Sequence, residues 1–182
     1  MRKLIMWNVI TLDGYFEGDK NWDLSFHETV WGPELEKFSI EQLNSADYVA
    51  YGRVTYEGMA AYWKPAKGKT AELMNKIPKL VFSRTLNSVD WNNTSLIKGN
   101  ASEEISKLKA QGDGNIFVFG SGNLSSTFIN DNLFDEYRIL VAPIIAGSGR
   151  PLFQKGVSAR PLTLVSSQPL LTGGLILTFK PK

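Results

Sequence analysis

The sequence predicts an α/β fold in three layers, with a central, mostly parallel sheet between helices on both faces. Short apolar runs typical of strands alternate along the chain with stretches of helical periodicity. Glycines directly follow several of these runs and open the next helix. Two β-rich segments near the C-terminus are separated by Thr172-Gly173-Gly174, which predicts an antiparallel hairpin. Alternating strands and helices favour parallel pairing, so this hairpin should form an antiparallel end of the sheet.

The first half of the chain opens with a predicted strand at 3–9, followed by a loop at 12–23 that glycine and aspartate interrupt. Pro33 suits the first turn of a helix that we expect to end near residue 45. A strand at 48–51, helices at 55–61 and 70–76, and a strand at 79–83 come next. Pro78 ends the last of these helices because proline cannot continue it.

The second half repeats this alternation. The pattern predicts a strand at 95–97, a helix to about residue 111, a strand at 115–119, a helix to about residue 129, a strand at 136–142, and hairpin strands at 162–167 and 174–180. Ser102 is the expected N-cap of the first of these helices, with two glutamates behind it at the positive end of the helix dipole. The strand at 115–119 is almost entirely apolar, which predicts burial on both faces.

Length and composition restrict the function classes. The 182 residues suit one domain, 1–182, and 43% hydrophobic with 21% charged residues is ordinary for a globular protein. A net charge of +2 gives no electrostatic argument for nucleic-acid or membrane-surface binding. The chain has no cysteine and one histidine, His27, so no metal site is expected and thiolate nucleophiles are excluded. His27 is expected to be an exposed loop or cap residue.

The N-terminal apolar run is short and is followed by Asn8 and Asp13, so it resembles a first strand rather than a secretory signal. No segment approaches the roughly 18 to 20 apolar residues of a membrane helix. We therefore expect a cytoplasmic protein.

Three strand ends suggest a ligand site, because open α/β sheets bind ligands at the carboxyl ends of their strands. These ends carry Gly120-Ser121-Gly122, Gly52-Arg53-Val54-Thr55 and Ser83-Arg84-Thr85. Glycines at helix starts let backbone N–H groups approach a pyrophosphate, and guanidinium groups suit phosphate. Each glycine motif could instead be only a tight turn, and each arginine only a solvated charge. Together they predict a doubly phosphorylated, adenosine-like ligand, and two arginines favour NADP over NAD.

A full dinucleotide fingerprint is missing, because serine occupies position 125. The motifs nevertheless carry a resemblance. The chain resembles the dihydrofolate-reductase-like superfamily and, within it, the C-terminal reductase domain of the bifunctional deaminase-reductase of riboflavin biosynthesis, above all its stand-alone bacterial members. The segments that carry the resemblance are 11–15, 51–57, 79–86, 117–122, 135–138 and 147–153, which occur in the order of the family.

This resemblance implies an eight-stranded sheet, NADPH binding, and hydride transfer to a C=N bond of a pyrimidine- or pterin-like substrate. The implied type is 5-amino-6-(5-phosphoribosylamino)uracil reductase, with dihydrofolate reductase and a non-catalytic NADPH-binding protein as alternatives. The resemblance implies that the first helix start binds the cofactor through Gly52, Arg53 and Thr55, and that the adenosine 2′-phosphate lies at Ser83 and Arg84. It implies that the pyrophosphate and nicotinamide are held by Gly120, Ser121, Gly122, Asn123 and Leu124. It also implies that Trp22 lies in the loop beside the nicotinamide. Trp22 could equally be an aromatic residue that packs this loop.

Imine reduction also requires a proton. By the resemblance, Glu34 stands where dihydrofolate reductases hold their acid, and Asp13 is a second acid near the cleft. Helix-dipole complementarity for Glu34 and a turn role for Asp13 are the alternatives. Two positions depart from the relatives: Ile77 stands where folate reductases have arginine, and Phe119 where the riboflavin-pathway reductase has a substrate-binding glutamate.

The resemblance further implies a homodimer. Apolar side chains occur on both faces of the strand at 136–142, and Ile144 and Ile145 follow it in a glycine-rich segment. Exposed isoleucines here would extend an apolar patch typical of an interface. Helices of the same chain could instead cover the strand.

Overall fold

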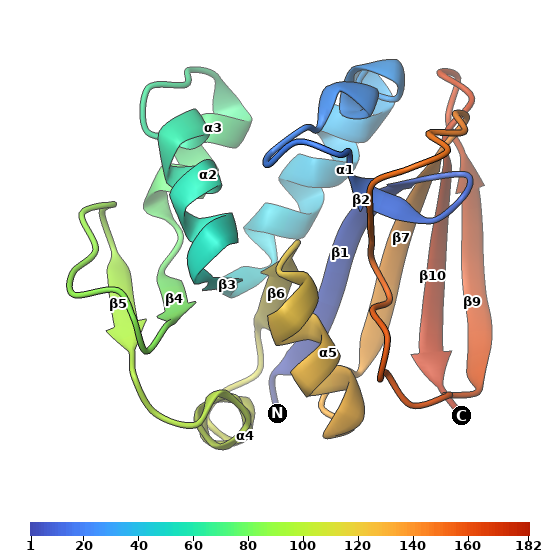
Figure 1. Ribbon diagram of the computed structural model, residues 1–182. Helices are drawn as coiled ribbons and strands as arrows, with labels where there is room; N and C mark the ends of the chain where they lie inside the picture. Colours follow the sequence, from blue (N-terminus) through green and yellow to red (C-terminus); the bar gives the residue numbers. More distant parts are fainter.

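The computed structural model describes residues 1–182 and contains one eight-stranded sheet in the order β5-β4-β3-β6-β1-β7-β10-β9 (Figure 1). All pairs from β5 to β7 are parallel, and β10 pairs antiparallel with both β7 and β9. The strands are β1 (Lys3–Thr11), β3 (Ala46–Gly52), β4 (Lys79–Phe82), β5 (Thr94–Ile97), β6 (Asn115–Phe119), β7 (Glu136–Ala142), β9 (Leu162–Pro169) and β10 (Leu175–Pro181). The predicted sheet and its antiparallel C-terminal hairpin are confirmed.

Helices cover the two faces of the sheet and complete the three layers (Figure 1). Helices α1 (Pro33–Asn44), α2 (Arg53–Trp63) and α3 (Lys69–Lys76) contribute to a core cluster with Ile5 of β1 and Phe117 of β6. Helices α4 (Ala101–Ala110) and α5 (Gly122–Asn130) contribute to a second cluster with Leu4 and Met6 of β1. Because neighbouring residues of β1 point to opposite faces, this one strand carries core residues of both layers.

The central strand β1 is longer than its neighbour β6. Their parallel register ends at the pair Trp7–Phe119, whereas the register of β1 with β7 continues to Thr11–Ala142. The chain leaves the sheet at Gly120, so the last residues of β1 have a strand neighbour on one side only. This places the end of β1 beside the turn between β6 and α5.

Three details differ from the sequence-based expectation. The predicted loop at 12–23 contains β2 (Tyr15–Glu17), which pairs with β8 (Arg150–Pro151), and the short 3-10 helix η1 (Ser25–Thr29) follows it. The N-cap of α4 is Asn100 rather than Ser102, because the Asn100 side chain accepts hydrogen bonds from the backbone N–H groups of Ser102 and Glu103 at 3.0 and 3.4 Å. Asparagine and serine are equally good caps, so the choice depended on where the chain turns.

His27 is the third correction, because it is not exposed. It lies in η1 with its ring edge-on to Phe26, 4.8 Å between ring centroids, and its Nε2 is buried without a hydrogen-bond partner in the protein. Burial lowers the pKa of His27 to about 4, because desolvation penalises the charged imidazolium. None of the helices is both long enough and apolar enough to cross a membrane.

Candidate functional site

The structure brings two of the predicted strand ends into direct contact. Strands β3 and β6 are neighbours in the sheet, and α2 and α5 begin at their carboxyl ends. The backbone N–H of Gly52 donates to Oγ of Ser121 at 2.8 Å, and the N–H of Ser121 donates to Oγ1 of Thr55 at 3.0 Å. These reciprocal hydrogen bonds fix the first turns of the two helices against each other.

The glycine at position 120 is required by this close approach. Gly120 has a φ of +62°, and a Cβ atom there would lie 3.2 Å from Cγ2 of Thr55. Ser121, which follows, is also in the left-handed region, with φ and ψ both at 60°. Two consecutive left-handed residues turn the chain sharply from β6 into α5, so the glycine motif is a tight turn as well as a candidate binding element.

Neither helix start has a side-chain cap. The N-cap of α2 is Gly52 and that of α5 is Ser121, and neither makes a side-chain hydrogen bond to the first turn of its helix. The first-turn N–H groups at both helix starts therefore keep their capacity to bind an anion, and the two positive dipole ends add to it. Leu124 is buried in the core, so only its backbone can serve such a site, whereas Asn123 is exposed.

A cavity of about 350 Å³ lies at the next strand ends, between β4, β5, α4 and α5. The residues that line it are Phe82, Ser83, Arg84, Ile97, Gly99, Asn100, Ala101, Ser102, Thr127 and Asp131. Oγ of Ser83 accepts hydrogen bonds from the N–H groups of Thr85 and Leu86 at 3.2 and 3.0 Å, so this hydroxyl shapes the turn after β4. Arg84 is exposed and makes no ion pair.

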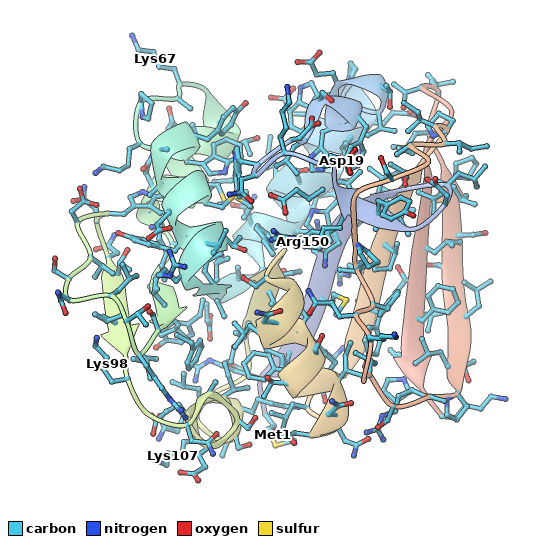
Figure 2. The ribbon with its side chains drawn as sticks, in the orientation of Figure 1. Met1, Asp19, Lys67, Lys98, Lys107 and Arg150 are labelled. Carbon is cyan, nitrogen blue, oxygen red and sulfur yellow. The ribbon has the colours of Figure 1, made fainter.

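The three predicted cationic or glycine-bearing strand ends are therefore on neighbouring strands, but the two arginines differ. Arg53 pairs with Glu57 one helical turn later, Nη1 to Oε2 at 3.0 Å, so part of its charge is already neutralised. The sequence did not lead us to Lys98. Its Nζ donates to the backbone carbonyl oxygens of Arg84, at 3.3 Å, and of Leu86, in the turn after β4; Figure 2 shows it at the β5 edge. The sequence pattern used for the other strand ends could have identified Lys98, because it directly follows the strand β5.

Trp22 is held against α2. Its indole ring lies over Gly58, where a Cβ atom would be only 2.3 Å from the ring. The φ of Trp22 is +63°, which is unusual for a residue with a side chain, and its backbone N–H donates to the buried carboxylate of Glu17. Arg150, which is labelled in Figure 2, pairs with the same carboxylate, Nη1 to Oε2 at 3.1 Å. Trp22 therefore packs its loop against α2, and its place beside a nicotinamide stays a prediction.

The two candidate acids lie in different surroundings. The carboxylate of Asp13 accepts hydrogen bonds from Oγ1 of Thr11 at 2.6 Å and from the N–H groups of Ala146 and Gly147 at 3.1 and 2.7 Å. The Thr11 hydroxyl and these amides lower the pKa of Asp13 to about 2, an arrangement that suits anchoring of the 146–147 segment rather than proton delivery. Oε2 of Glu34, in the first turn of α1, accepts from the N–H of Leu171 at 2.6 Å.

The region beneath α1, α2 and α3 is apolar. Ile77 and Phe119, at the two positions where the resemblance implies polar side chains, are both buried in the cluster there. Trp7 of β1 contacts Phe38 of α1, with 5.2 Å between ring centroids. The structure offers aromatic surface here, and no group of three or more acidic or histidine residues could hold a metal ion.

Comparisons with known sequences identify a protein family and two related proteins. A protein-family model described as the RibD C-terminal domain matches residues 2–176. Uncharacterized protein YyaP of Bacillus subtilis is 34% identical over 157 residues, which cover 84% of this chain and 80% of that protein. Uncharacterized protein YwjB of the same organism is 26% identical over 159 residues, or 85% of this chain and 84% of that protein.

Solved structures show the same fold. A putative riboflavin biosynthesis protein from Shewanella sp. PV-4 superimposes with a TM-score of 0.83 at 23% identity and covers 99% of both chains. The deaminase/5-amino-6-(5-phosphoribosylamino)uracil reductase of Thermotoga maritima gives a TM-score of 0.69 at 15% identity, over 100% of this chain and 57% of that one. Dihydrofolate reductase from Enterococcus faecalis, solved with NADP(H), gives 0.68 at 14% identity, over 99% and 96%.

Proposed function

The chain belongs to the RibD C-terminal domain family, and on that basis we propose that it is an NADPH-dependent reductase. The substrate we propose is a pyrimidine- or pterin-like compound with a C=N bond, most closely of the 5-amino-6-(5-phosphoribosylamino)uracil type. The family assignment supports an oxidoreductase. The family assignment does not specify the cofactor or the substrate, and the residues at the strand ends support our choice of both.

One observation carries the proposal: two uncapped helix starts meet at the Thr55–Ser121 contact, next to a cavity that Arg84 lines and Lys98 adjoins. The open N–H groups suit a pyrophosphate. The cavity suits the adenosine half of the same molecule, and the adjacent cations suit a 2′-phosphate. Ser83, Arg53, Gly122 and the backbone at Asn123 and Leu124 belong to the same proposed site.

When bound, NADPH would supply the hydride, and the chain's own residues would exclude water and provide a proton. Trp22, held on Gly58, closes the loop over α2 and is the residue we propose to shield the nicotinamide. For the proton to the substrate nitrogen we propose Glu34 over Asp13. Asp13 is held ionised by three donors, whereas only one carboxylate oxygen of Glu34 has a hydrogen-bond partner.

Two residues favour a second candidate function, NADPH binding without turnover. The resemblance implies polar substrate anchors at positions 77 and 119, and this chain has the buried residues Ile77 and Phe119 there. A protein that binds NADPH without turnover would need neither anchor. Dihydrofolate is the second substrate candidate, and the likeness to dihydrofolate reductase supports the fold alone.

We also propose a homodimer, because β9 is an edge strand whose Leu164 and Val165 are half exposed. Ile144 and Ile145, at the end of β7, are exposed at 37% and 71%. The cytoplasmic location stays a prediction from the sequence.

The experiment that tests the proposed function follows the loss of NADPH absorbance with two substrates, the ribosylaminopyrimidine and dihydrofolate. Turnover of the ribosylaminopyrimidine supports the proposal. Turnover of dihydrofolate alone would show that dihydrofolate is the substrate instead. NADPH binding with turnover of neither would instead support the non-catalytic alternative.

A further inference from the structure

Asn8 of β1 is a buried polar residue for which the fold shows no use. It is only 5% exposed, and its Nδ2 has no hydrogen-bond acceptor in the protein. A buried donor without an acceptor destabilises the folded state, so such groups are rare and call for an explanation. At this edge the buried side chains of Thr11, Thr55 and Ser125 all make hydrogen bonds. The hydroxyl of Tyr51, near the end of β3, is also buried without a partner, but Tyr51 belongs to the core cluster on the other face of the sheet.

The register of the sheet fixes where the Asn8 side chain lies. Asn8 is the first residue of β1 beyond the last pair with β6, Trp7–Phe119, and therefore lies next to the turn at Gly120. Its side chain shares a face with Leu4 and Met6, which belong to the core cluster that includes α5. Asn8 thus places an unused N–H donor near the carboxyl edge of the sheet, on the side of the helix start of α5. Nδ2 is covered in this structure, so a ligand contacts it only when neighbouring side chains move aside.

Its surroundings do not explain an asparagine. Ile139 is its partner in β7, and Met6 and Ile10, which flank it on the same face of β1, both pack in the apolar cluster on that face. A leucine of similar size would satisfy these neighbours better than an amide does. Residues that violate local packing rules in this way are expected where function requires them.

We propose that Nδ2 of Asn8 donates a hydrogen bond to the carboxamide oxygen of the nicotinamide, so that Asn8 determines recognition of the redox half of the cofactor. This inference rests on the proposed function and deepens it. The helix starts of α2 and α5 would hold the pyrophosphate, and the nicotinamide half then has to extend from there along the sheet edge. Asn8 adjoins the Gly120 turn on that edge, and the carboxamide oxygen is an acceptor that an N–H group can satisfy.

The test compares wild type, Asn8→Leu and the matched control Thr70→Val. Thr70, in α3, also has a buried polar atom without a partner, Oγ1, but it lies away from the strand ends. Each variant is titrated with NADPH and with adenosine 2′,5′-bisphosphate, which lacks the nicotinamide, and its thermal denaturation is recorded. Asn8→Ala, which removes the amide without adding bulk, repeats the titrations if leucine does not fit.

We expect Asn8→Leu to bind NADPH about 3- to 10-fold more weakly, the range for one hydrogen bond, and to bind the bisphosphate like wild type. Its melting temperature should rise, because the unpaired donor is gone. Thr70→Val should gain stability without any change in NADPH affinity. The inference would be overturned, and the proposed function left intact, if NADPH affinity were unchanged in both Asn8 variants. The same holds if the affinity for the bisphosphate fell as much as the affinity for NADPH. An increase in substrate KM with unchanged NADPH affinity would overturn it in favour of a substrate contact. Wild type that binds neither ligand would overturn the proposed function together with the inference.

Discussion

Oγ1 of Thr55, in the first turn of α2, accepts a hydrogen bond from the backbone N–H of Ser121 at 3.0 Å, although 66 residues separate them. A second bond runs the other way, from the N–H of Gly52 to Oγ of Ser121. The side chain of Ser121, the N-cap of α5, is used to join the two helix starts instead of capping its own helix, and the N-cap of α2 is Gly52, which has no side chain. The first-turn N–H groups are therefore left for a ligand, and the site depends on how closely the β6–α5 turn approaches Thr55.

Gly120→Ala tests this close approach. The new Cβ would lie 3.2 Å from Cγ2 of Thr55, at a φ of +62° that costs a residue with a side chain about 1 to 2 kcal/mol. Gly147→Ala is the control, because its φ of +76° is close to that of Gly120 and its Cβ would meet no atom within 4 Å. Urea denaturation should show a larger loss of stability for Gly120→Ala, and NADPH titration a loss of affinity for that variant alone. Equal effects of the two substitutions would show that packing against Thr55 is unimportant.

Glu34→Gln tests the proposed proton donor. Loss of a general acid should lower kcat by on the order of 10²-fold or more, while NADPH affinity stays as in wild type. Glu36→Gln is the control, because Glu36 is an exposed acid in the same first turn of α1. A Glu34→Gln enzyme as fast as the control would leave Glu34 as the partner of Leu171 and a helix-dipole charge.

His27 predicts a dependence of stability on pH. Burial lowers its pKa from 6.5 to about 4, so between these values the unfolded chain binds a proton that the folded chain refuses. The contribution of His27 to the free energy of unfolding should therefore be fully present above about pH 6.5. It should be lost as the pH decreases to about 4, which lowers the free energy of unfolding by about 3 kcal/mol in total. His27→Gln, which cannot titrate, should flatten this part of the profile measured by urea denaturation. A mutant profile as steep as that of wild type would contradict the assignment.

Ile144→Asp tests the homodimer. Sedimentation equilibrium at micromolar concentration should give twice the 20.3 kDa chain mass for wild type and the chain mass for the variant. NADPH affinity should survive the substitution, because Ile144 does not line the cavity beside Arg84. Wild type that sediments as a single chain would refute the dimer.

The sequence predicted most of the sheet because its strands are local patterns: an apolar run, then a glycine or a charged residue, then a helix. Gly52, Arg84 and Gly120 could be placed at one edge because parallel strands end together. Lys98 follows the same rule and was predictable, since it directly succeeds β5.

The remaining features depend on contacts between distant segments. The pairing of β2 with β8 joins two- and three-residue strands more than 130 residues apart, too short to give a periodic signal. The anchoring of Asp13 by the Ala146 and Gly147 amides is equally non-local. In the sequence Asn8 is one polar residue in an apolar run, and only the register with β6 shows that its amide is buried beside Gly120.

The binding of NADPH and NADH to wild type and Arg84→Ala tests the central claim most directly. Each charge-assisted contact to a 2′-phosphate contributes roughly 1.5 to 3 kcal/mol, so wild type should bind NADPH at least about 10-fold more tightly than NADH. Arg84→Ala should lose most of this preference and keep its NADH affinity, and Lys98→Ala should weaken NADPH in the same way. Equal affinity of the wild-type protein for the two cofactors would contradict the account.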